Sequence, residues 1–174
     1  MKSRTYAIVT LIAGLTALPS FAKAQAPTDQ QIVGIVLAAN KIDIDAGKAA
    51  VAKATDPQVK AFAQQMITDH SALQKSVMDL GAKLHVTPAD SPTADSLKKQ
   101  AAETAARLKG LSGAAYDKAY IDNEVAYHQA VIDAVTNTLI PNAQNGELKS
   151  ALQGAAPAFV GNLDHAKNIQ AALH

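Results

Sequence analysis

The chain has 174 residues, and the 48% of them that are hydrophobic supply enough apolar material for one domain with a single buried core. It contains no cysteine, which excludes disulfide bonds, thiolate metal sites and cysteine nucleophiles. The formal net charge is only +1 and no run of basic residues occurs, which excludes the electrostatic footprint of a protein that binds nucleic acid or anionic membranes.

The first 24 residues are predicted to be a cleavable signal peptide. Two basic residues precede an apolar run over residues 6–18, and small residues then form a cleavage site after Ala24. The run is short for a membrane span, and an uncleaved N-terminal anchor is the alternative. We therefore expect export to the periplasm, a linker over residues 25–27, and a helical domain over residues 28–174 without a transmembrane segment.

Two long helices joined by a very short turn are predicted after the linker. The first begins at Thr28, which forms a capping box with Gln31, and its apolar residues then recur at steps of three and four to about Thr55. Asp56 and Pro57 supply a cap and a first-turn proline for the second helix. Because the turn is so short, the two helices must pack as antiparallel neighbours.

A long connection with one short helix follows. Prolines end the second helix and open a loop over residues 85–92, and a shorter helix is expected over residues 93–109, where Gly110 stops it. The second and fourth helices are therefore joined by a long connection that holds one short helix.

The remaining sequence predicts a second hairpin. Ser112 is expected to cap a fourth helix that stops before Pro141. Turn-forming residues over 142–146 then lead to a last helix, in which Pro157 is expected to produce a kink.

Two hairpins joined by one long crossover match the ferritin-like four-helix bundle, here with a short extra helix in the crossover. Aromatic residues make up only 4% of the chain, which favours an all-α domain packed through small and aliphatic side chains. A simple up-and-down bundle with an extra helix is the alternative fold.

Polar residues interrupt the apolar seams of the four long helices at one depth. Four of them lie about 15 residues into their helices, roughly 20–25 Å from the start at 1.5 Å per residue: Asp43, His70, His128 and Asn162. Because each is central, the shared depth does not depend on the direction in which any helix runs. The sequence therefore predicts a polar layer in the middle of the bundle.

Further polar residues lie near this layer. Three share the face of His128 at helical steps of three and four: Asp117, Tyr120 and Glu124. His165 follows Asn162 by three residues on the same side of the last helix, whereas Asp69 is turned by about 100° from His70 and would reach the layer only from the side.

Carboxylates and imidazoles that converge from several helices suit one transition-metal ion, such as iron, manganese or zinc. The candidate ligands are Asp43, His70, Glu124, His128 and His165, and the candidate supporting network is Asp69, Asp117, Tyr120 and Asn162. The Glu-x-x-His pairs of di-metal carboxylate bundles are absent, which counts against a ferroxidase-type centre. A metal-free hydrogen-bond network that fixes helix register is the alternative.

No phosphate loop, nucleophile motif or cofactor fingerprint occurs, so no catalytic residue is predicted and a binding or structural protein is favoured over an enzyme. A metal-dependent oxidoreductase or hydrolase remains an alternative. So does an interaction module that presents a helix face to an envelope protein or to a second copy of the chain.

Three stretches resemble the exported bacterial domain-of-unknown-function family 4142 (DUF4142). They are residues 61–70, residues 113–120 together with His128, and residues 157–166. The resemblance covers nearly all of the mature chain. It implies a ferritin-like fold and a periplasmic or envelope location, where a role in envelope stress is one expectation, and it implies no settled activity.

The resemblance also places the family's recurrent polar positions on this chain, at Asp69, His70, Asp117, Tyr120, His128 and a histidine of the last helix. The chain departs from the family in two places. Asp43 stands where the family often has Glu, and Asn162 stands where it often has His, which leaves His165 as the nearest imidazole. Both departures count against strong metal binding by this chain.

Overall fold

The computed structural model describes residues 26–173, so the predicted signal peptide and His174 lie outside the described residues. Within that range every regular element is helical. The elements are α1 (Asp29–Lys53), α2 (Pro57–Leu84), α3 (Pro92–Lys109), α4 (Gly113–Ala134), the π-helical segment η1 (Val135–Leu139), α5 (Ile140–Asn142) and α6 (Gly146–Ala172). None of these helices is both long enough and apolar enough to cross a membrane.

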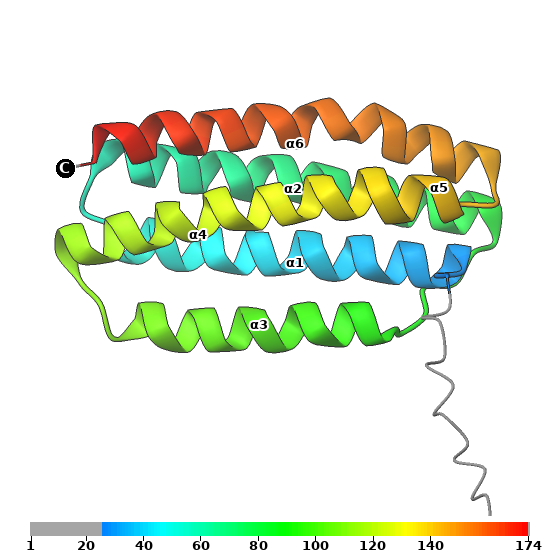
Figure 1. The fold of residues 1–174 in the computed structure, drawn as a ribbon, viewed down its shortest axis with the longest axis horizontal. Coiled ribbons are helices and arrows are strands. Elements are labelled where there is room, and N and C mark those ends of the chain that lie inside the picture. Colours follow the sequence, from blue (N-terminus) through cyan, green and yellow to red (C-terminus); the bar gives the residue numbers. More distant parts are fainter. Residues whose placement is uncertain (1–25, 174) are drawn as a thin grey trace, which may run out of the picture.

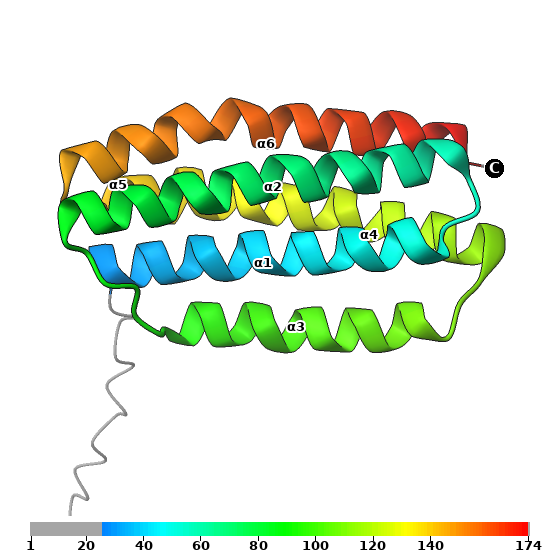
Figure 2. The ribbon, with the colours of Figure 1, turned by 180° about the vertical axis from the view of Figure 1, so that it is seen from behind.

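The helices form two antiparallel hairpins, α1–α2 and α4–α6, that pack as a four-helix bundle (Figure 1). Between them, α3 carries the chain back along the bundle, so that α2 and α4 run in the same direction. Both views place α3 outside the bundle and beside α1 (Figure 2). The predicted plan of two hairpins and one long crossover with a short helix is confirmed.

Local capping explains where the helices begin. The Thr28 side chain accepts a hydrogen bond from the Gln31 backbone while the Gln31 side chain accepts one from Thr28, as the capping box predicts. Asp56 caps α2, whose first residue is Pro57. Ser112 precedes α4 as predicted, but its side chain makes no capping hydrogen bond.

The prediction that the fourth helix stops before Pro141 is wrong. The chain passes from α4 into the π-helical turn η1 and then into α5, which contains Pro141. Leu139 and Ile140 already have helical dihedral angles, so the helix runs on into Pro141. The π-helical turn, in which the Ile140 amide donates to the Val135 carbonyl, lies directly before the position at which Pro141 lacks an N–H donor. The second hairpin is therefore longer than its sequence indicates.

Close packing of α1 against α2 is made possible by glycine. A Cβ atom on Gly47 would lie 2.9 Å from the Ala63 carbonyl oxygen of α2, so only a residue without a side chain fits here. Gly47 is one helical turn from Asp43 on α1, and this contact therefore fixes the distance between Asp43 and α2.

Two apolar clusters fill the bundle, one on each side of its middle. The first is centred on Phe62, Met66 and Tyr120, and the second on Ile32, Leu139 and Leu152. Neither cluster includes the buried polar residues of the middle of the bundle. The fold thus places a polar layer between two apolar ones, as the sequence predicts.

Candidate metal centre

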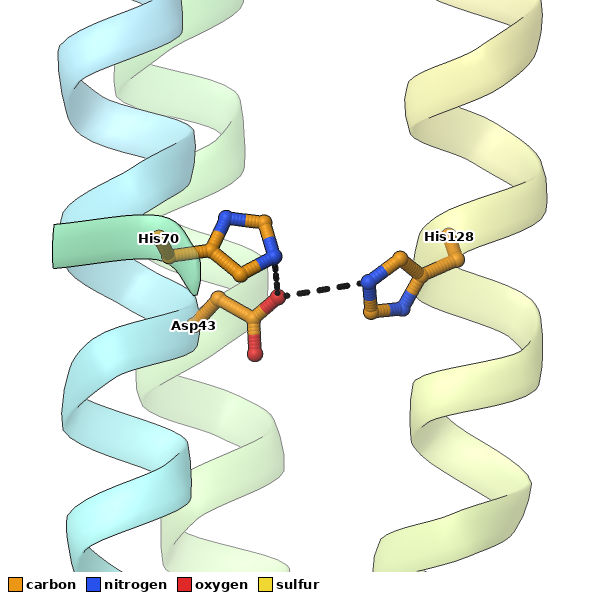
Figure 3. A group of neighbouring side chains, drawn as sticks. All are labelled: Asp43, His70 and His128. Carbon is orange, nitrogen blue, oxygen red and sulfur yellow. Dashed lines mark ion pairs between the residues drawn. The ribbon is translucent and has the colours of Figure 1, made fainter. Parts of the chain in front are cut away.

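Asp43, His70 and His128 meet in the middle of the bundle, from α1, α2 and α4 respectively (Figure 3). The Asp43 Oδ2 atom lies 2.8 Å from His70 Nε2 and 3.5 Å from His128 Nε2. One donor atom from each residue lies within 4.8 Å of the other two. Within residues 26–173 this is the one group of three such side chains that is compact enough to share an ion.

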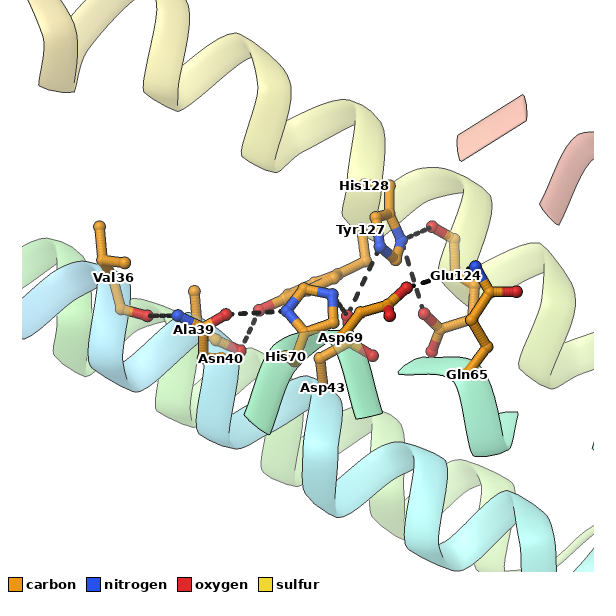
Figure 4. A network of polar contacts seen from close by, with 10 residues as sticks. All are labelled: Val36, Ala39, Asn40, Asp43, Gln65, Asp69, His70, Glu124, Tyr127 and His128. Atoms are coloured by element: carbon orange, nitrogen blue, oxygen red, sulfur yellow. Dashed lines mark hydrogen bonds and ion pairs between the residues drawn. The ribbon is translucent and has the colours of Figure 1, made fainter. Parts of the chain in front are cut away.

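The Nδ1 atom of each histidine is held by a carbonyl oxygen. His70 Nδ1 lies 2.8 Å from Asn40 Oδ1, and the Asn40 amide nitrogen donates in turn to the Val36 carbonyl at 2.9 Å. His128 Nδ1 lies 3.0 Å from the Glu124 backbone carbonyl (Figure 4). A carbonyl oxygen only accepts, so each Nδ1 carries a proton and each ring turns its Nε2 atom toward Asp43.

The group is buried and its inner atoms lack hydrogen-bond partners. Asp43, His70 and His128 are exposed by 1%, 4% and 0%. Neither Asp43 oxygen nor either Nε2 atom makes an aligned hydrogen bond, although Asp43 and His70 lie close together. Buried polar atoms are nearly always satisfied in folded proteins, so this cluster of unsatisfied atoms requires an explanation.

Burial also sets the protonation of the neighbouring groups. It raises the pKa of the Glu124 carboxyl well above its usual range, and the neighbouring Asp43 carboxylate raises that pKa further. Burial lowers the pKa of His128, and this effect outweighs the attraction of Asp43. The metal-free site therefore holds His128 neutral, which is the form that binds metals.

Of the five predicted ligands, the structure brings three together and places a fourth beside them. The Glu124 carboxylate lies 3.6 Å from His128 Nδ1 and next to Asp43, so it borders the compact group without belonging to it. His165 is outside the layer. Its Nδ1 lies 3.1 Å from the Gln65 amide oxygen and its ring packs edge-on against Phe62.

The predicted supporting network is only partly assembled. Tyr120 and Asn162 are buried in the bundle, but Asp69 is exposed and accepts a hydrogen bond from Gln65. Asp117 lies at the end of the bundle, away from the layer. Its carboxylate accepts from the Thr55 backbone at 2.9 Å, from the Thr55 hydroxyl at 2.5 Å and from the Asp56 backbone at 2.9 Å, which fastens the α1–α2 turn to α4.

Sequence reasoning missed two residues of the site. Asn40, which orients His70, lies three residues before Asp43 and thus on the same face of α1, a spacing that was visible in the sequence. Tyr127 donates from its hydroxyl to the Ala39 carbonyl at 2.8 Å and so ties α4 to α1 beside the layer. No sequence signal indicated that contact.

Two imidazoles and one carboxylate are a donor set that suits borderline first-row metal ions. Both rings are already oriented, and the unsatisfied atoms point to one place. The residues present therefore fit a metal ion.

Comparison with known proteins gives the chain a family. The family model described as "Domain of unknown function (DUF4142)" matches residues 16–169. The chain belongs to the DUF4142 family. Among curated proteins, none matches it significantly.

One solved structure that is similar to this DUF4142 protein is "CopM in the Cu(II)-bound form". The two share a TM-score of 0.65 and 14% sequence identity, over 86% of this chain and 100% of the other. At this level of identity the likeness establishes a shared helical fold.

Proposed function

We propose that this DUF4142 protein binds one first-row transition-metal ion through Asp43 Oδ2, His70 Nε2 and His128 Nε2. The observation that carries the proposal is the set of buried, unsatisfied donor atoms that face one another in the middle of the bundle. Leaving such atoms unpaired costs about 1–3 kcal/mol each, and an ion would satisfy them together.

The donor set limits the choice of ion. Imidazole and carboxylate suit iron, zinc and manganese, and the chain has no thiolate that would favour a soft ion. Cu(II) joins these candidates because it accepts the same donors, binds most tightly in the divalent series, and is the ion bound to CopM in the similar structure.

The predicted signal peptide supports a periplasmic location, and the arrangement of two hairpins and a crossover supports a relation to ferritin-like bundles. In that setting we propose that the protein sequesters or buffers the ion, which agrees with the expected role in envelope stress. A metal-dependent enzyme is less favoured, because the site lies deep in the bundle.

Metal analysis of the purified protein tests the proposal. The wild-type protein and a His165→Ala variant should each bind one equivalent of ion, whereas a His70→Ala/His128→Ala double variant should bind less than about a tenth of an equivalent. His165→Ala is the matched control, because that histidine lies outside the group. At a free ion concentration of about 100 times Kd, the wild-type protein should gain about 2.7 kcal/mol of stability.

Two outcomes would contradict the proposal. Equal metal binding by the double variant would place the ion elsewhere. An absence of both binding and stabilisation in the wild-type protein, for all four ions, would leave the polar layer as a structural network.

A further inference from the structure

Three polar atoms beside the layer stay unsatisfied after the proposed ion has used its three donors. They are Asp43 Oδ1, Glu124 Oε2 and the Tyr120 hydroxyl, each buried without a hydrogen-bond partner. Tyr120 is fully buried and Glu124 is exposed by 1%. An ion alone therefore leaves part of this group of unsatisfied atoms unexplained.

Two of these residues share a face of α4 with His128, one of the proposed ligands. Tyr120, Glu124 and His128 follow one another at intervals of four residues, so they share one face of α4. Burial raises the pKa of Tyr120 far above its ordinary value, and the charges of Glu124 and Asp43 raise it further, which is consistent with a hydroxyl that faces these carboxylates.

The chemistry of the three atoms is complementary to a small polar molecule. The tyrosine hydroxyl donates one hydrogen bond, and the two carboxyl groups accept or share protons. Three protein ligands also leave at least one coordination position of a transition metal free.

We propose that the ion carries one small non-protein ligand with an oxygen or nitrogen donor atom, either water or an inorganic anion, which Tyr120 and Glu124 hold by hydrogen bonds. This inference rests on the proposed function, because the ligand is bound to the proposed ion. It assigns a binding role to two residues that do not belong to the compact ligand group.

A cavity approaches the proposed ion on the side of His70. A cavity of about 1800 Å³ opens between the helices, and its lining includes His70, Asn40 and Phe159. The Phe159 ring stacks on His70 with centroids 6.2 Å apart, so the cavity reaches a ligand of the proposed ion.

Azide binding to the cobalt(II)-loaded protein tests the inference, because cobalt(II) reports its ligands through visible absorption. Azide should change the spectrum of the wild-type protein, and Tyr120→Phe should weaken azide binding about tenfold, the effect of one lost hydrogen bond. Tyr116→Phe is the matched control, since Tyr116 is also buried and stacks on Tyr120 with centroids 6.4 Å apart. It should bind azide as the wild-type protein does.

The outcomes separate the inference from the proposed function. If the protein binds one equivalent of cobalt but azide leaves the spectrum unchanged, or if both tyrosine variants bind azide equally, the inference is wrong and the metal site stands. If the wild-type protein binds no cobalt, both fail. Should Tyr120→Phe not fold, Glu124→Gln provides the second variant, and unchanged azide affinity in that variant would overturn the inference.

Discussion

Asn40 connects the polar layer to the backbone of α1. Its amide nitrogen donates to the Val36 carbonyl, and its amide oxygen accepts from His70 Nδ1. The first contact determines which end of the amide faces His70, and the second determines which ring nitrogen of His70 is free. One uncharged residue thus selects the tautomer of a proposed metal ligand.

Replacing Asn40 by alanine should therefore weaken metal binding without removing any ligand. We expect a loss of affinity of about 10–100-fold, because the His70 ring loses the partner that fixes its orientation. Competition with a chelator of known affinity measures the change. Asn168→Ala, at an exposed position of α6, is the control and should leave the affinity unchanged; equal affinities in the two variants would show that Asn40 is not needed.

Glu124 should make the stability of the metal-free protein depend on pH. Its pKa is raised in the folded protein, whereas the unfolded chain ionises near the ordinary value of 4.5. Above that value the unfolded state binds fewer protons, so the free energy of unfolding of the wild-type protein should fall with rising pH relative to Glu124→Gln. The slope is at most about 1.4 kcal/mol per pH unit, and it ends at the folded pKa.

Urea unfolding of both proteins between about pH 5 and 8 measures this difference. The His128 titration is common to both proteins and largely cancels. Parallel curves for the two proteins would mean that Glu124 ionises normally in the folded state.

At the scale of the elements, two glycines show how α1 meets its neighbours. Gly47 admits the backbone of α2, and Gly34 admits the loop that precedes α3. The Ala89 amide of that loop donates to the Gln30 carbonyl at 3.0 Å, which holds the loop on the first part of α1. Both contacts depend on the absence of a side chain.

Gly34→Ala should accordingly destabilise the protein by about 1–3 kcal/mol, because the new Cβ would lie 2.1 Å from the Ala89 carbonyl oxygen and must displace the loop. Gly154→Ala in α6 is the control. No atom lies within 4 Å of its new Cβ, so it should stabilise its helix by up to about 1 kcal/mol. Thermal unfolding measures both changes, and a Gly34→Ala variant as stable as the wild-type protein would contradict the close approach.

The whole molecule consists of a four-helix bundle with a fifth helix added at its side. Only Ala94 and Leu108 of α3 are buried, whereas nine residues of α1 are. The apolar area that holds α3 is therefore small. The contact with α3 therefore contributes little to the stability of the bundle.

Native-state hydrogen exchange should detect this difference. The amides of α3 should exchange through a local opening at a lower free energy than the central amides of α1 and α2, which require global unfolding. Denaturant dependence distinguishes the two, since a local opening exposes little surface. Equal opening free energies in α3 and α1 would mean that the crossover belongs to the cooperative unit.

The sequence by itself determined the helices, their hairpin pairing and the depth of the polar layer. Capping residues such as Thr28 and Asp56 act locally, and the apolar period reports the buried face of each helix directly. The position of a residue along the bundle follows from the number of residues that precede it in its helix, because the rise per residue is constant. For this reason Asp43, His70 and His128 were correctly expected to lie at the same level.

The tertiary structure decided which side chains at that depth face one another. The rotation of each helix and its distance from its neighbours depend on all of its packing partners, such as the glycine contact of α1 with α2, and no local pattern encodes them. For this reason His165 was expected in the layer but contacts Gln65, and Asp117 was expected near it but fastens a turn. Asn40 joined the site for the same reason, because only the packed bundle brings its amide to His70.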